Sequence, residues 1–256
     1  MSDGSAGDVD YGRFGDDYSR YRQPEPAIAA LVRAALGDAT TVLNVGAGAG
    51  SYEPTDLQVT AVEPSASMRA QRPPGRPAID ASAEDLPFPD AAFDAAIATF
   101  TVHQWRDLEA GLAELRRVAR GPVVVLTCDP ARLSRFWLAE YVPEVITVEE
   151  RRYPSMDRLR AAWPAASIRP VPIPWGCVDG FGEAYYGRPE ALLDPGARHA
   201  NSAWSFVDPA LHARFERALG IDLEDHSWDR RWGHLRTQPT FEGSLVLVVD
   251  PGSPVP

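Results

Sequence analysis

The chain has 256 residues, of which 45% are hydrophobic and 24% charged, a composition typical of a globular protein with a sizeable core. Its formal net charge of −11 argues against nucleic acid and anionic membranes as partners, because both repel an acidic surface. Two cysteines, Cys128 and Cys177, are too few for a disulfide framework. The polar start "MSDGSAGDVD" lacks the apolar run of a signal peptide, and no stretch reaches the roughly 18 apolar residues of a membrane span, so a cytoplasmic protein is expected.

The first half of the chain predicts strands that alternate with helices. After an N-terminal tail, the spacing of apolar residues predicts a helix over residues 25–36. Strands are expected at 40–45, 58–64, 95–100 and 121–129, with a helix at 108–120. The last of these strands is apolar throughout, which is typical of a strand covered on both faces. Together with the alternation, this predicts an α/β fold with a doubly wound parallel sheet.

The second half has a different character and ends on a strand. A helix is expected at 131–142, a proline-interrupted edge strand at 166–174, a helix at 208–219 and a closing strand at 244–250. Between them lies a segment rich in Trp, Tyr and Gly. The predicted organisation is a tail and lid segment (1–24), a core (25–130), a helical and irregular cap (131–240), and a closing strand with its tail that completes the core sheet (241–256).

Three alternating glycines follow the first predicted strand in "TVLNVGAGAG", residues 41–50. Such a turn is where α/β proteins bind nucleotides, since glycine lets the backbone approach the ligand. Ser51 stands where a dinucleotide fold needs Gly or Ala, and Pro54 leaves room for little helix before the next strand. A pyrophosphate requires the N-terminus of a solid helix, so phosphate is not expected. Glu63 ends the second strand and can accept hydrogen bonds from both ribose hydroxyls, which predicts a nucleoside ligand without phosphates.

Four stretches resemble, in order and spacing, motifs of the class I S-adenosylmethionine-dependent methyltransferases, specifically the methyltransferase type 11 group. They are "VLNVGAGAG" (42–50), "AVEPSASM" (61–68), "SAEDLPFPDAAFD" (82–94) and "ATFTVHQW" (98–105). The resemblance implies a Rossmann-like sheet of about seven strands, the last antiparallel, with an aromatic-rich insertion before the final strand. It also implies methyl transfer from S-adenosyl-L-methionine, which becomes S-adenosyl-L-homocysteine. The acceptor would be an O, N, C or S atom of a small molecule of specialised metabolism, and the enzyme a monomer or a homodimer.

The same resemblance assigns the cofactor-binding residues. Met68 would pack against the adenine, and the turn Ser82–Ala83–Glu84 would follow the adenine edge. Tyr18 and Arg22 of the lid segment would meet the methionine part of the cofactor, although a surface patch of aromatic and arginine side chains is an equal alternative. The full set is Tyr18, Arg22, Asn44, Gly46, Ala47, Gly48, Glu63, Pro64, Met68, Ser82, Ala83, Glu84, Thr99, Phe100 and His103.

Asn44 departs from the aspartate that this family usually has in the first strand. An aspartate there would accept hydrogen bonds from the amides of the glycine turn. The carbonyl oxygen of Asn44 can accept them too, but a negative charge near the cationic cofactor is lost. Two interpretations remain open, a modest loss of cofactor affinity and a site with an altered use.

His103 is the candidate catalytic base, since it follows the fourth strand at the carboxyl edge of the sheet, where this fold places its ligands. Transfer from a sulfonium mainly requires collinear reacting atoms and exclusion of water, so His103 could equally pack over the cofactor without moving a proton. An aromatic wall could hold the substrate, with core packing or a dimer surface as the alternative. Its candidate residues are Trp105, Trp175, Phe181, Tyr185 and Tyr186.

No metal is predicted, because the remaining histidines lack ligand spacing with the cysteines. Three other functions remain open. The chain could bind the cofactor and catalyse a reaction without methyl transfer, such as a cyclisation. It could be an NAD(P) dehydrogenase, which the short segment after Gly50 disfavours, or a binding module without activity.

Overall fold

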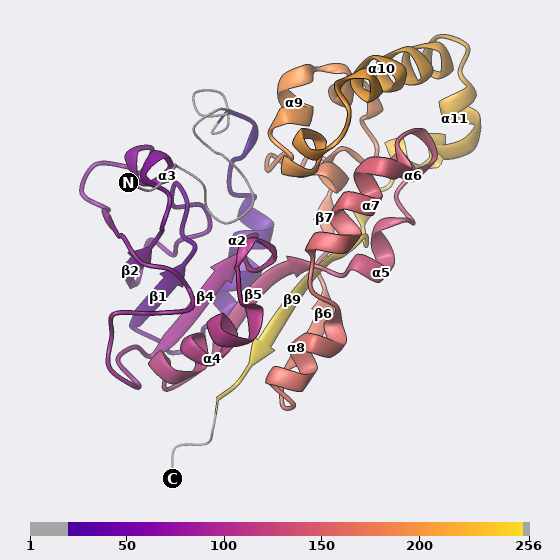
Figure 1. The fold of residues 1–256 in the computed structure, drawn as a ribbon. Helices are drawn as coiled ribbons and strands as arrows, with labels where there is room; N and C mark the ends of the chain where they lie inside the picture. The colour runs from indigo at the N-terminus through magenta and orange to yellow at the C-terminus, as the bar shows by residue number, and fades with distance from the viewer. Residues whose placement is uncertain (1–19, 253–256) are drawn as a thin grey trace.

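The computed structural model describes residues 20–252, which fold around a seven-stranded mixed sheet (Figure 1). The strands lie in the order β3-β2-β1-β4-β5-β9-β6. The first five are parallel, whereas β9 runs antiparallel between β5 and β6. The predicted doubly wound sheet with an antiparallel last strand is therefore confirmed. The strands are β1 (Thr41–Val45), β2 (Gln58–Val62), β3 (Ala78–Ile79), β4 (Ala95–Thr99), β5 (Val123–Cys128), β6 (Ser167–Pro170) and β9 (Leu245–Asp250).

Alternate residues of the central strands pack on opposite faces of the sheet. In β5, Val124 and Leu126 join the core that contains α2 (Pro26–Ala35), while Val123 and Val125 join the core that contains α4 (Leu108–Val118). All six residues of β5 are buried, as a continuous apolar sequence predicts for a strand covered on both faces. The sheet is thus the middle of three layers.

Between β1 and β2, residues 46–57, all of which the structure describes, contain turns but no helix. The next connection holds only the short α3 (Ala66–Ala70), with Ser65 as its N-cap. The absence of a long helix after the glycine turn in this described segment agrees with the prediction from Pro54.

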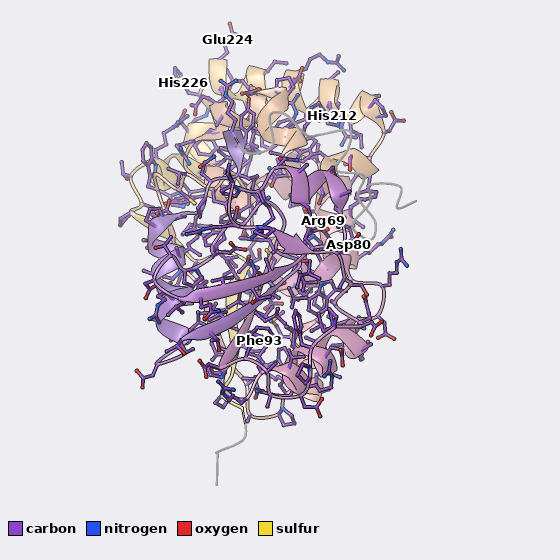
Figure 2. The ribbon with its side chains drawn as sticks, turned by 90° about the vertical axis from the view of Figure 1, so that its left-hand side faces the viewer. Arg69, Asp80, Phe93, His212, Glu224 and His226 are labelled. Atoms are coloured by element: carbon purple, nitrogen blue, oxygen red, sulfur yellow. The ribbon has the colours of Figure 1, made fainter. Side chains whose placement is uncertain are left out.

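The cap lies beyond the carboxyl ends of the parallel strands. Figure 1 shows α9, α10 and α11 gathered past that end of the sheet. Figure 2 places Phe93, which directly precedes the β4 region, at the opposite end of the molecule from His212, Glu224 and His226 of the cap. The loops that follow β1, β2 and β4 therefore open toward the cap.

Short helices around buried tryptophans build the cap. The helix expected at 131–142 is divided into two short helices, and the helix expected at 208–219 extends to Glu224. Trp137, Trp204 and Trp228 are almost fully buried. The elements are α5 (Pro130–Leu133), α6 (Leu138–Tyr141), α7 (Pro143–Arg152), α8 (Met156–Ala162), β7 (Ile173–Pro174), η2 (Gly182–Tyr185), η3 (Pro189–Leu193), α9 (Pro195–His199), η4 (Ser202–Phe206), α10 (Pro209–Glu224), α11 (Ser227–Trp232), η5 (Gly233–Arg236) and β8 (Thr240–Phe241).

The segment expected to form the cap also contributes to the sheet. Strand β6 pairs with β9 at the edge of the sheet, a position compatible with its prolines. Among the helices that the structure describes, none has the length and apolar character needed to cross a membrane.

Candidate functional site

The glycine turn adopts a backbone that only glycine accepts easily. Gly46, Gly48 and Gly50 have φ values of +68°, +50° and +99°. The N–H groups of Gly46 and Ala47 donate to the carbonyl oxygen of Val62, at 2.9 and 3.0 Å. A Cβ atom on Gly46 would overlap the side chain of Thr101, so the turn lies directly against the loop after β4. The turn therefore sits where the strand order reverses between β1 and β4, the usual ligand crevice of such sheets.

Glu63 follows β2 and ties the glycine turn to the next loop. Its carboxylate accepts hydrogen bonds from the N–H of Gly48 and the N–H of Ser65, both at 2.8 Å. Only 3% of the residue is exposed, and this burial raises the pKa of the carboxyl, while the two N–H donors and nearby arginines lower it in part. Each carboxylate oxygen can accept more than one hydrogen bond, so the group can still bind a ribose hydroxyl.

The other predicted cofactor residues occupy several different environments. The methyl group of Met68 lies 3.2 Å from the point where a Cβ atom on Gly48 would stand, and Ala83 is buried in the core. Glu84 accepts the N–H groups of residues 106 and 107, at 2.9 and 3.3 Å, so in this structure it stabilises the loop before α4. Pro64, Ser82, Thr99 and Phe100 are half-buried, and Tyr18 lies outside the described residues.

Asn44 is part of a buried charged cluster under the glycine turn. Its side-chain amide donates to Glu53 Oε1 at 3.0 Å, and Arg72 donates to the same oxygen at 2.7 Å. Glu53 and Arg72 form an ion pair whose side chains are each 3% exposed. Arg72 also donates to the carbonyl oxygens of Ala47 and Gly48. Through Arg72 the cluster thus holds the backbone of the glycine turn in place.

The expected hydrogen bonds from the glycine-turn amides to the Asn44 carbonyl do not form. Those amides bind Val62 and Glu63 instead, and Asn44 Oδ1 has no hydrogen-bond partner among the described residues. The structure also gives a reason for the amide at this position. A carboxylate in place of Asn44 would stand about 3 Å from the buried carboxylate of Glu53, and like charges at that distance repel strongly.

Three segments converge around Phe100, at the end of β4. Phe100 has φ +52°, an unusual value for a bulky residue, and such strain is typical of functional sites. Its ring lies 6.1 Å from the ring of Tyr52 and 5.3 Å from that of Phe181. Asp179 of the cap accepts hydrogen bonds from Tyr52 at 2.7 Å and from Arg22 at 2.5 Å. Arg22, predicted to meet the cofactor, is therefore paired with a carboxylate of its own chain.

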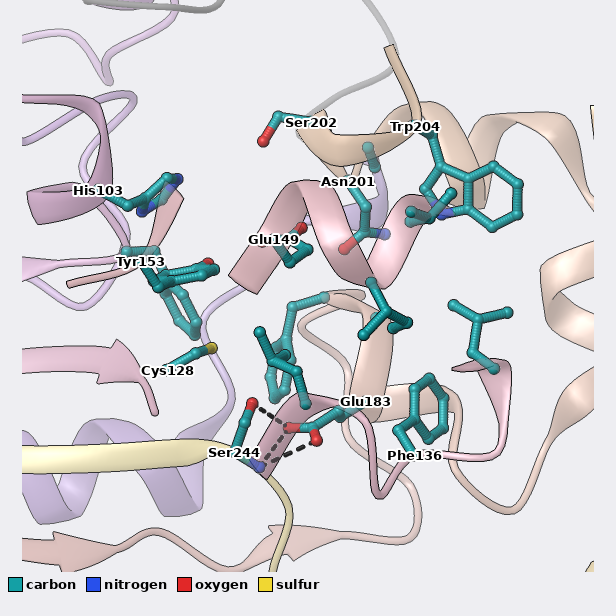
Figure 3. A pocket seen from close by; sticks show the side chains of 18 of the residues that line it. His103, Cys128, Phe136, Glu149, Tyr153, Glu183, Asn201, Ser202, Trp204 and Ser244 are labelled. Atoms are coloured by element: carbon teal, nitrogen blue, oxygen red, sulfur yellow. Dashed lines mark hydrogen bonds between the residues drawn. The ribbon is translucent and has the colours of Figure 1, made fainter. Parts of the chain in front are cut away.

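Next to Phe100 a cavity extends into the cap (Figure 3). It encloses about 910 Å³ of empty space, a figure that includes open solvent at its mouth. We call it the cap pocket. It is lined by Arg22, Phe100, His103, Gln104, Cys128, Leu133, Phe136, Leu138, Val145, Ile146, Glu149, Tyr153, Phe181, Gly182, Glu183, His199, Ala200, Asn201, Ser202, Trp204 and Ser244.

His103 lies in the short helix η1 (Val102–Gln104) and faces the cap pocket. Its ring centroid is 4.4 Å from that of Tyr153, and its Nδ1 is buried without a hydrogen-bond partner among the described residues. Burial lowers the pKa of His103 well below its usual range, and the charges of Arg152 and Arg22 act in the same direction. The imidazole is therefore neutral, the state that a base needs, but its basicity is weak.

The five aromatic residues predicted for the substrate site, all within the described part of the chain, occupy different environments. Phe181 lines the cap pocket. Tyr186 is fully buried and stacks on Phe241, with ring centroids 5.0 Å apart. Trp175 is 42% exposed, Tyr185 is buried outside the pocket lining, and Trp105 packs on Gly111 of α4. The pocket aromatics that sequence reasoning missed are Phe136, Tyr153 and Trp204.

Two acidic pocket residues were also missed. Glu149 lies on α7 and Glu183 on η2, and a single acid in an otherwise apolar segment was the available signal for Glu183. Within residues 20–252, no group of three His, Cys, Asp or Glu side chains is placed to hold a metal ion. Cys128 and Cys177 are both buried and free.

Comparison with known proteins links this geometry to a family. Residues 43–125 match the family model described as "Methyltransferase domain". The chain is 33% identical over 127 residues to a malonyl-(acyl-carrier protein) O-methyltransferase of Pseudescherichia vulneris. The aligned stretch covers 46% of this chain and 51% of that protein. The match therefore spans about half the length of this curated relative.

Two solved structures extend the comparison to the whole fold. A protein described as a methyltransferase from an antibiotic biosynthesis pathway of Anabaena variabilis ATCC 29413 has a TM-score of 0.83 and 26% identity, over 91% of this chain and 99% of that chain. Geranyl diphosphate C-methyltransferase from Streptomyces coelicolor A3(2) shares the fold, with a TM-score of 0.52 and 15% identity over 89% and 77% of the two chains.

Proposed function

We propose that this chain is a methyltransferase that methylates a small organic molecule bound in the cap pocket, because residues 43–125 match a methyltransferase domain and the fold is similar to that of a methyltransferase. S-adenosyl-L-methionine is the methyl donor, and S-adenosyl-L-homocysteine is the product. The donor supplies an electrophilic methyl group when it is bound. Holding it, orienting it and keeping water away are the tasks of the chain's own residues.

The residues of the crevice fit this cofactor. Gly46 has no side chain because Thr101 fills the space beside it, and the glycines of the turn expose backbone that the amino-acid part of the cofactor can approach. Glu63 can bind the ribose, and Met68 can cover the adenine. Arg22 would reach the cofactor carboxylate only by sharing or leaving its pair with Asp179.

One observation carries the assignment of the cap pocket to the methyl acceptor. Phe100 lines the cap pocket, while the adjacent residue Thr101 touches the glycine turn. Two consecutive residues therefore separate the cofactor crevice from the pocket, which is the proximity that direct methyl transfer requires. His103 borders the same junction and would act there as a base or as a packing residue. The pathway described for the Anabaena relative favours a specialised metabolite as the acceptor.

Calorimetry with S-adenosyl-L-homocysteine tests the cofactor assignment. Wild type should bind, and Glu63→Ala should bind about 10- to 100-fold more weakly, because charge-assisted hydrogen bonds to the ribose are lost. Asp85→Ala is the matched control, since Asp85 is an exposed acid in a neighbouring loop. Binding unchanged by Glu63→Ala would refute the assigned site.

A screen of metabolites with a methyl-labelled donor tests the reaction. A labelled product supports methyl transfer. A substrate that is consumed without label, in the presence of the cofactor, would instead support the alternative of a methyltransferase fold that catalyses another reaction such as a cyclisation.

A further inference from the structure

Glu183, in the lining of the cap pocket, carries a carboxyl group without an ion-pair partner among the described residues, although the positive charge of Arg132 acts on it. Glu183 is 4% exposed, and within the described residues it forms no ion pair. Its oxygens accept the N–H of Ser244 at 2.8 and 2.9 Å and the hydroxyl of Ser244 at 2.7 Å. Figure 3 shows Ser244 to one side of the carboxyl group, within the lining of the pocket. A carboxylate so placed lacks most of its hydration, which is unfavourable without a counter-ion.

The lining of the cap pocket holds two acidic side chains and one basic one, while the charges of Arg152 and Arg132 act on the lining residues His103 and Glu183. The charged side chains in the lining are Arg22, Glu149 and Glu183. Arg22 is already neutralised by Asp179. His103 and His199 also line the pocket, but burial lowers the pKa of each, so both are neutral. Burial likewise raises the pKa of the Glu183 carboxyl, to about 7, although its Ser244 donors and the charge of Arg132 oppose the shift.

The remaining lining suits an aromatic or apolar body. Phe136, Phe181 and Trp204 line the cavity. Aromatic faces attract cations as well as apolar groups, so they would also favour a positively charged ligand close to Glu183.

We propose that the methyl acceptor, if the function above holds, is a protonated amine with an apolar or aromatic body, and that Glu183 binds its ammonium group. Figure 3 places His103 and Glu183 on different walls of the cavity. The ammonium group is therefore an anchor, and the atom that receives the methyl group lies on the part of the substrate near His103. The buried carboxylate of Glu183 disfavours an anionic acceptor of the malonyl kind named for the Pseudescherichia relative.

Three probes of similar shape test the proposal by calorimetry: phenethylamine as the cation, 2-phenylethanol as the neutral form and phenylacetate as the anion. Wild type at pH 7.5 should bind the amine about tenfold more tightly than the alcohol, and the anion least, because a charge-assisted hydrogen bond forms only with the amine. Equal binding of amine and alcohol, or tightest binding of phenylacetate, would overturn the proposal. This ranking needs no variant and is measured with and without S-adenosyl-L-homocysteine.

Glu183→Gln then assigns the preference to one residue. The variant should bind amine and alcohol alike, while its affinities for the alcohol and for S-adenosyl-L-homocysteine stay at wild-type values. Glu150→Gln is the control, because Glu150 lies on α7, a helix that contributes to the pocket, but does not itself line the pocket. If Glu183→Gln keeps the preference for the amine, Glu183 does not bind the ammonium group. Its role would then be limited to accepting hydrogen bonds from Ser244 at the start of β9. If wild type does not bind S-adenosyl-L-homocysteine, the proposed function is refuted. The ranking of the three probes, measured without S-adenosyl-L-homocysteine, would still test the amine preference by itself.

Discussion

Changing Asn44 to the aspartate that is usual in this family should harm the protein. The side-chain amide of Asn44 donates to Glu53, and both residues are buried. Asn44→Asp removes the donor and places a second carboxyl group about 3 Å from the first. A substitution toward the family pattern would ordinarily be expected to be neutral or stabilising.

The size of the effect follows from two competing costs. Two carboxylates about 3 Å apart repel by roughly 5 kcal/mol at an effective dielectric constant of about 20, an amount that Arg72 offsets only in part. Protonating one of them at pH 7 costs about 4 kcal/mol, given a pKa near 3.9 for an unperturbed aspartate. Because protonation costs less free energy than the repulsion between two carboxylates, the new carboxyl group takes up a proton and can donate to Glu53. The expected destabilisation is about 4 kcal/mol at pH 7 and about 1.5 kcal/mol at pH 5.

The sign of the pH dependence distinguishes this explanation from a packing defect. The folded pKa of the new carboxyl group is raised, so stability is retained at low pH and lost as the pH rises above the unfolded value near 4. Urea denaturation of wild type and Asn44→Asp at pH 5 and pH 7 measures the difference. The double variant Asn44→Asp/Glu53→Gln exchanges acid and amide, and should be at least about 2 kcal/mol more stable than the sum of the single changes predicts. A single variant as stable as wild type at pH 7, or a loss independent of pH, would refute the reasoning.

Three more outcomes are expected. Gly46→Ala should abolish binding of S-adenosyl-L-homocysteine in calorimetry and lower the melting temperature, because the turn needs φ +68° and the new Cβ overlaps Thr101. Arg72→Met should cost about 3–5 kcal/mol in urea denaturation, since it leaves the carboxylate of Glu53 buried without its cation; a loss below about 1 kcal/mol would contradict the ion pair's role. Glu183 has a folded pKa of about 7 against an ordinary value of 4.5, so wild type should lose about 3 kcal/mol of stability relative to Glu183→Gln as the pH rises from 4.5 to 7. Parallel melting curves for the two proteins across that range would count against the raised pKa.

The glycine turn and Glu63 could be predicted because local chemistry determines them. A turn with positive φ requires glycine, and an acid at the end of a neighbouring parallel strand must lie beside that turn. Asn44 could be recognised as a departure, but its reason could not. The contact with Glu53 depends on how the segment after the turn, which has no periodic pattern, folds back under it.

The cap was harder to predict, because its aromatic segments lack a helical or strand period. Phe181 precedes the short helix η2 and lines the pocket, whereas Tyr186 follows the same helix and is packed in the core. Phe136 and Trp137 are adjacent, yet Phe136 lines the pocket and Trp137 packs against Trp228. Composition indicates that such rings are buried, but the choice between pocket and core depends on contacts with distant segments.

The position of β9 between β5 and β6 has a consequence for how the chain folds. Val123 of β5 pairs with Asp250 and Cys128 with Leu245, partners that are more than one hundred residues apart in the sequence. During synthesis β5 can pair with β4 long before residue 250 has left the ribosome. Until β9 arrives, β5 is therefore an edge strand, although it lies inside the finished sheet. That edge reads "VVVLTC" and carries no charge, which makes it prone to pair with other chains. Folding of the cap in the intervening time therefore sets how long the sheet is exposed to aggregation.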